Sequence, residues 1–127
     1  MMKRVLTSLL AVAFCATGLT ASGKVLVREF SGTGMGTTAE FVVRAPWILD
    51  WRVNSDYQQS LSIEVALVDS TTGFHAGLVL KTKRAGNGVR LFNKSGRFRF
   101  RVSSSLTRWT LKVQQLTPDE AELYKPL

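Results

Sequence analysis

The sequence predicts an all-β protein, an antiparallel β-sandwich of about eight short strands with a short C-terminal helix. The first observation is that apolar and polar residues alternate in several short runs, the pattern of strands with one buried side. The second is that glycine, asparagine, aspartate and serine gather between these runs, where turns are needed. Many short strands with regular turns favour two antiparallel sheets packed face to face.

The regular strands are the runs in which every second residue is apolar. They are expected at residues 38–43, 47–53, 61–68, 97–102 and 108–113, and less regular strands at 24–30, 74–81 and 88–92. The alternation places Trp47, Trp51 and Trp109 on the core side. If Trp47 and Trp51 were exposed instead, they would form an aromatic platform for sugar rings. Phe92 and Tyr57 remain candidates for surface aromatics.

Three segments are expected to be connections between strands. The glycines of residues 32–36 have the spacing of a phosphate cradle, but a β pattern follows them where such a cradle requires a helix. The segment Gly86-Asn87-Gly88 predicts a tight hairpin, because Asn-Gly suits a two-residue turn. Residues 103–105, all serine, are expected to connect the last two strands.

The last two strands suggest a specific pairing. If residues 103–108 are the connection, Phe100 faces Leu111 on the inner side and every inward step joins apolar residues. On the outer side Arg99 then faces Lys112. The candidate anion- or partner-binding residues on this face are Arg97, Arg99, Arg101, Arg108 and Lys112. The alternative is a solvated face whose long side chains only cover the sheet.

A short helix is expected near the C-terminus. Thr117 is suited to cap it, Pro118 to occupy its first position, and Glu120 to complete a capping box three residues after the cap. Pro126 would end it. The helix is expected to make about two turns from Pro118 to Tyr124.

The N-terminus has the layout of a secretory signal peptide. Lys3 and Arg4 precede an apolar run, and small residues follow. We expect residues 1–23 to be the signal peptide, cleaved after Gly23, with cleavage after Gly18 as the alternative. Residues 24–127 would then form a single β-sandwich domain in the periplasm or outside the cell. The only cysteine, Cys15, lies in the leader, so the remaining chain would have no thiol and no disulfide.

Composition favours anionic partners. The chain has 17 lysines and arginines against 9 acidic residues, a formal net charge of +8. Such a balance promotes association with anionic polymers or surfaces. Nucleic acid is a poor candidate, because the chain is expected to be exported. The phenylalanines between Arg97 and Arg101 also point away from the arginines and cannot stack bases beside them.

Residues for catalysis are sparse. His75 is the only histidine, and a metal site on it would need carboxylates as further ligands. No Gly-x-Ser-x-Gly motif supports a serine nucleophile. Four acidic residues are scattered along the chain, mostly at outward positions or in turns: Asp50, Asp56, Glu64 and Asp69. We expect no catalytic residue, no cofactor and no metal.

Two stretches of the chain resemble a class of small, uncharacterised secreted bacterial proteins. The first is Phe-Ser-Gly-x-Gly-x-x-Thr-Thr-x-x-Phe-Val-Val at 30–43 with Pro-Trp-x-Leu-x-Trp at 46–51. The second is Gly-x-Phe-x-Phe-x-Val at 96–102 with Trp-Thr-Leu-Lys-Val at 109–113. The resemblance implies an extracytoplasmic β-sandwich without a defined activity. The closing pattern is also similar to that of pre-peptidase C-terminal domains, although the acidic calcium loop is not evident.

The expected function is a non-enzymatic binding or interaction module. Its partner would be an anionic polymer, an anionic envelope component or an acidic protein. The alternative is a small extracytoplasmic hydrolase or carbohydrate-acting enzyme that uses His75 or the scattered carboxylates. The sequence leaves the oligomeric state open.

Overall fold

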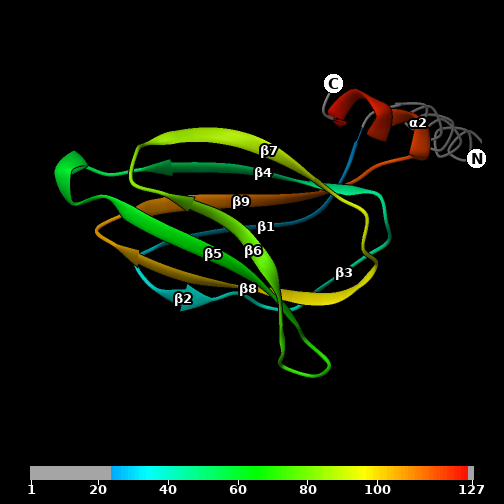
Figure 1. Ribbon diagram of the computed structural model, residues 1–127, viewed down its shortest axis with the longest axis horizontal. Coiled ribbons are helices and arrows are strands. Elements are labelled where there is room, and N and C mark those ends of the chain that lie inside the picture. The colour runs from blue at the N-terminus through cyan, green and yellow to red at the C-terminus, as the bar shows by residue number, and fades with distance from the viewer. Residues whose placement is uncertain (1–23, 126–127) are drawn as a thin grey trace, which may run out of the picture.

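The computed structural model describes residues 24–125, which form strands and one short C-terminal helical segment (Figure 1). A 3₁₀ turn, Gln58–Ser60, precedes β5, and another, Glu122–Tyr124, follows helix α2 (Pro118–Ala121). The strands are β1 (Val25–Thr33), β2 (Gly36–Thr37), β3 (Phe41–Val43), β4 (Trp47–Asn54), β5 (Ser62–Asp69), β6 (His75–Thr82), β7 (Gly86–Phe92), β8 (Gly96–Ser105) and β9 (Arg108–Gln115).

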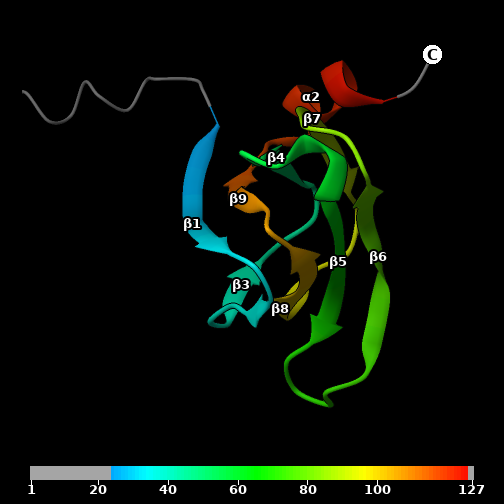
Figure 2. The ribbon, with the colours of Figure 1, turned by 90° about the vertical axis from the view of Figure 1, so that its left-hand side faces the viewer.

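The strands form two antiparallel sheets, which confirms the predicted all-β sandwich. Sheet A has the order β1-β9-β4-β7, and sheet B has the order β2-β8-β5-β6 with β3 also paired to β8 (Figure 2). Because β2 and β3 pair with successive parts of β8, they act as one interrupted strand. With that pair counted once, the strand order is 1-8-3-6 in one sheet and 2-7-4-5 in the other, which is the topology of a jelly roll.

The inward residues of both sheets form the core. Phe100 is fully buried, stacks on Phe41 with ring centroids 4.8 Å apart, and meets Phe30 edge to face at 6.2 Å. Trp47 is fully buried, and its ring stacks on half-buried Phe92 at 4.2 Å. Trp109 is also buried, so the predicted core positions of Trp47 and Trp109 are confirmed.

The predicted pairing of the last two strands is wrong. β8 pairs with β5, β2 and β3 in sheet B, whereas β9 lies between β1 and β4 in sheet A. Phe100 therefore pairs with Leu67, and Leu111 with Phe30 and Trp51. Residues 103–105 belong to β8, and the chain crosses between the sheets at Leu106 and Thr107. The apolar sides of β8 and β9 therefore face each other across the core and do not lie side by side in one sheet.

The predicted hairpin at Gly86–Gly88 is also wrong, because these residues lie inside β7. Its neighbour along the chain, β6, belongs to sheet B, while β7 pairs with β4 in sheet A. Gly88 faces Trp51 across this pair, and a Cβ atom on Gly88 would lie 2.7 Å from the Trp51 ring. The glycine serves close packing of a tryptophan rather than a turn.

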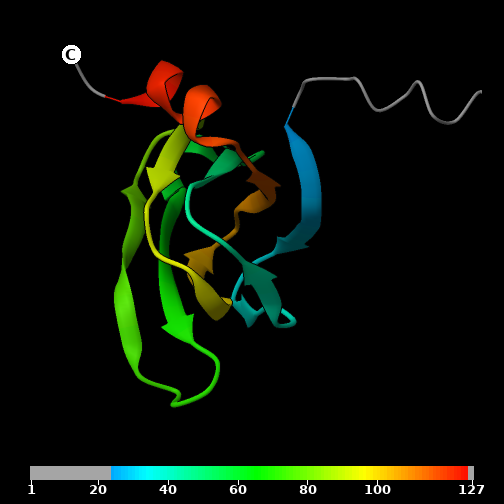
Figure 3. The ribbon, with the colours of Figure 1, turned by 90° about the vertical axis from the view of Figure 1, so that its right-hand side faces the viewer.

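The predicted C-terminal helix is confirmed at α2, with a 3₁₀ turn that extends it to Tyr124. Thr117 Oγ1 accepts from the Glu120 N–H at 3.2 Å, and Glu120 Oε1 accepts from the Thr117 N–H at 2.8 Å, which completes the capping box. The segment lies at one end of the sandwich (Figures 1 and 3). Its Ala121 packs with Ile48 and Leu116 in a second apolar cluster, which buries the outward side chain of Ile48.

The expectation of a signal peptide over residues 1–23 lies outside the described residues. Within residues 24–125, no helix has the length and apolar character needed to cross a bilayer.

Candidate functional site

The five candidate binding residues lie on two different faces. Arg97, Arg99 and Arg101 point outward from β8 on sheet B, and all three are exposed. Arg108 and Lys112 point outward from β9 on sheet A. The structure therefore brings together three of the five residues, which we name the β8 arginine row (Arg97, Arg99 and Arg101), and separates the other two from them.

The β8 arginine row runs beside small apolar residues of β5. Arg101 pairs with Ala66 and Arg99 with Val68, and both partners are buried although they lie on the outer side of the sheet. On the far side of β5, Leu78 of β6 pairs with Ala66, and His75 of β6 pairs with Val68. Such a surface leaves the guanidinium groups in water while the aliphatic stems have apolar neighbours to rest on.

One carboxylate is engaged at the end of the row. Arg97 Nη1 lies 3.2 Å from Glu40 Oε2, and Ser70 Oγ donates to Glu40 Oε1 at 2.6 Å. Arg99 Nε donates to the same Ser70 Oγ at 3.3 Å. Ser70 follows β5 in the β5–β6 connection, the green loop that extends beyond the other strands (Figures 2 and 3). The hydrogen bond from Ser70, and then Arg97, lower the pKa of the Glu40 carboxyl.

On sheet A, the two remaining candidates have acidic neighbours. Arg108 forms a two-pronged ion pair with Asp56, with Nη1–Oδ2 at 3.0 Å and Nη2–Oδ1 at 3.3 Å. Lys112 sits between Glu29 of β1 and Asp50 of β4 in the strand register. The positive charge of sheet A is thus balanced locally to a greater degree than that of the β8 arginine row.

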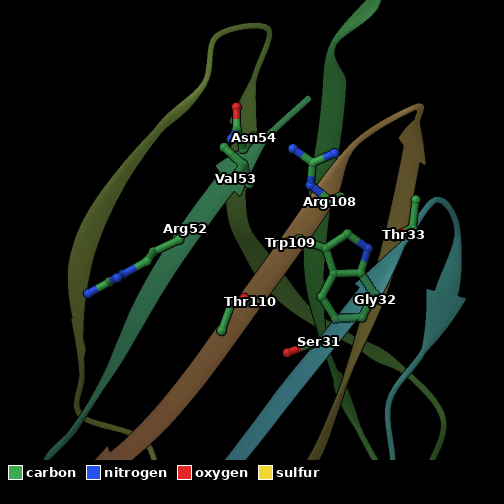
Figure 4. A pocket seen from close by; sticks show the side chains of 9 residues that line it. All are labelled: Ser31, Gly32, Thr33, Arg52, Val53, Asn54, Arg108, Trp109 and Thr110. Carbon is green, nitrogen blue, oxygen red and sulfur yellow. The ribbon is translucent and has the colours of Figure 1, made fainter. Parts of the chain in front are cut away.

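The outer face of sheet A contains a shallow hollow that no sequence pattern indicated (Figure 4). It has a volume of about 460 Å³ and is crossed by β1, β9 and β4. Its outward side chains are polar or basic: Ser31, Thr33, Arg52, Asn54, Arg108 and Thr110. Each of the three strands shows these outward positions in its alternation, but only the register places them side by side.

Two further cations close the open side between the sheets. Arg90 Nη1 of β7 donates to the carbonyl oxygens of Leu78 and Val79 at 2.8 and 3.0 Å, and Lys94 Nζ approaches the Ala76 carbonyl at 3.3 Å. These acceptors belong to β6, the edge strand of sheet B. Their engagement protects an exposed strand edge against pairing with another chain.

The residues considered for catalysis are dispersed. His75 is exposed at the start of edge strand β6, and residues 24–125 contain no group of three side chains that could ligate a metal around it. Asp69 Oδ1 accepts from the Thr71 and Thr72 amides and so shapes a turn. Asp56 holds Arg108, and Tyr57 is exposed without an aromatic neighbour among the described residues.

Comparison with known proteins returned no match, either to protein-family models or among curated protein sequences.

Proposed function

We propose that the protein is an exported, non-enzymatic module that holds an anionic polymer along the β8 arginine row. The observation that supports this most is the placement of three arginines at successive outward positions of one strand, all exposed. Successive outward positions on a strand are about 6.8 Å apart, so the guanidinium groups form an extended line. A line of cations suits a repeating anion better than a single small one.

The local charge also favours the β8 arginine row over the other candidates. One carboxylate, that of Glu40, lies within ion-pair distance of Arg97, and the side chain of Arg101 makes no hydrogen bond to another residue in the described range. Arginine forms paired hydrogen bonds with sulfate-, phosphate- or carboxylate-bearing groups. The row therefore keeps cationic donors available to a partner.

The class of polymer follows from the expected export of the chain. A periplasmic or secreted protein meets the anionic polysaccharides and phosphorylated glycolipids of the cell envelope rather than cytoplasmic nucleic acid. We accordingly infer an envelope polyanion as the partner.

Charge reversal on the two faces tests the proposal. The double variant Arg99→Glu, Arg101→Glu should bind immobilised heparin and phosphorylated lipopolysaccharide at least about tenfold more weakly, because a hydrogen bond to a charged group contributes about 1.5–3 kcal/mol. The matched control Arg28→Glu, Lys112→Glu makes the same charge change on sheet A, at two residues that do not line the hollow on that face. Salt titration should show a steeper loss of binding for the wild type than for the β8 variant.

The outcome that overturns the proposal is equal loss in both double variants, or no loss in either. Equal loss would mean that net charge alone governs retention. Circular dichroism and thermal unfolding of each variant separate lost binding from lost structure.

The Glu40→Gln variant is expected to bind the same polyanions about two- to fivefold more tightly at neutral pH, because it removes the carboxylate that competes for Arg97. The affinity of the wild type for the polyanions should approach that of the variant only at low pH. Since the pKa of Glu40 is lowered, its carboxylate stays charged until the pH falls below the usual range for glutamate. Affinity measured from pH 7 down to pH 3 checks this, and a wild type and variant with identical profiles would contradict it.

A further inference from the structure

We propose that the hollow on the outer face of sheet A is a second binding site, for a sugar residue that carries a carboxylate, that is, a uronate. Its six outward side chains form two rows across three strands. One row is Ser31–Thr110–Arg52, and the other is Thr33–Arg108–Asn54. The site lies on the sheet opposite the β8 arginine row and is independent of the function proposed above.

The chemistry of the lining is that of hydrogen-bond donors without a carboxylate. Arg52, Thr110 and Ser31 make no side-chain hydrogen bond to another residue within 24–125, so their donors are available to a ligand. Asn54 Oδ1 already accepts from the Ser55 amide at 2.8 Å, which leaves its NH₂ group for the hollow. Hydroxyl groups that both donate and accept match sugar hydroxyls. The guanidinium of Arg52, which extends from β4 away from the other lining side chains (Figure 4), matches a carboxylate at the edge of the hollow.

One wall of the hollow contains an ion pair between two exposed side chains. The pair with Asp56 uses both terminal nitrogens of Arg108 and limits the conformations of its side chain. Asp56 follows β4, the strand that also carries Arg52 and Asn54, so the pair ties β9 to the end of β4. A preorganised wall reduces the loss of side-chain freedom on binding.

The dimensions and polarity favour an acidic sugar over other small ligands. Three strands by two outward rows cover roughly 10 Å by 7 Å, a larger area than one phosphate group needs. The volume of about 460 Å³ lies within the usual range of small-molecule sites, about 300–1,000 Å³. Trp109, the aromatic residue of the lining, is buried on the core side, so a neutral sugar gains no stacking surface here (Figure 4). Binding must come from polar contacts and from the charge of Arg52.

The test is an NMR titration of the ¹⁵N-labelled protein with trigalacturonate and with a glucuronate trisaccharide. Maltotriose serves as the neutral control and sodium sulfate as the simple anion. We expect saturable shifts of the Gly32, Asn54 and Thr110 amides with at least one uronate and not with maltotriose. Arg52→Gln should weaken this binding by at least about tenfold, and Thr110→Val should weaken it as well. Lys81→Gln, on the opposite sheet and outside the β8 arginine row, should leave it unchanged.

Three results would overturn the proposal. The first is the absence of saturable shifts with both uronates. The second is sulfate producing the same shifts at the same concentration, which would mark an unspecific anion site. The third is equal loss in Arg52→Gln and Lys81→Gln, which would assign the effect to net charge. None of these results decides whether the β8 arginine row binds a polyanion, because that property is measured with different variants.

Discussion

Replacing Phe100 with alanine is expected to lower the free energy of unfolding by about 3–5 kcal/mol. The side chain is fully buried at the centre of β8, stacked on Phe41 and in edge-to-face contact with Phe30. Its removal leaves a cavity that residues of both sheets border, and neither sheet can move into it without disturbing its own hydrogen bonds. For a domain of this size the loss is a large share of total stability, which is typically about 5–15 kcal/mol.

Phe74→Ala is the matched control for Phe100→Ala. Phe74 is 72% exposed, so the same change of side chain should alter stability by less than about 0.5 kcal/mol. Urea unfolding followed by tryptophan fluorescence measures both variants. Similar effects of the two substitutions would mean that Phe100 does not occupy the core position described above.

Gly32→Ala is expected to lower the free energy of unfolding by about 1–3 kcal/mol, although it adds one methyl group. Gly32 of β1 pairs with Trp109 of β9, and the tryptophan ring lies over it. A Cβ atom at this position would lie 2.5 Å from Cζ2 of Trp109. The ring is buried and donates its Nε1–H to the Gly34 carbonyl at 2.9 Å, so it cannot swing away without losing that bond.

Gly36→Ala provides the comparison, because a Cβ atom there meets nothing within 4 Å. Thermal unfolding should show a clear decrease in midpoint for Gly32→Ala and little change for Gly36→Ala. If both glycines tolerate alanine, the close approach of Trp109 to β1 is not present in solution.

The fold class followed from the sequence because it depends on local chemistry. Alternation along β5 and β8 reports that one side of each strand is buried, and the capping residues Thr117 and Glu120 act within a single turn. Neither signal requires knowledge of which strand lies next to which. These elements were therefore predicted to within a few residues.

Strand partners could not be read in the same way. The pattern of Phe98, Phe100 and Val102 fits an apolar partner beside it in the same sheet as well as one across the core. The predicted pairing placed both strands in one sheet, whereas the crossing at Leu106 and Thr107 places the apolar partner of β8 across the core. The hairpin predicted from Asn87-Gly88 was wrong for a related reason. Gly88 accommodates the ring of Trp51, a residue distant in sequence.

The grouping of the candidate site residues could not be predicted either, because it also depends on which strands pair. Alternation correctly placed Arg99 and Lys112 on outward sides, but the two residues belong to opposite faces. The hollow on sheet A depends on side chains from β1, β4 and β9, and no spacing within one strand marks their convergence. A cluster formed by register becomes visible only when the register is known.

The position of β9 has a consequence for biogenesis. This strand is the last to be synthesised, yet it supplies the partner of β1 and the link between β1 and β4. An incomplete polypeptide leaves the first strand without any neighbour in its sheet, and distant pairings of this kind form slowly. Sheet A therefore cannot close around β1 in a nascent chain until β9 has been made.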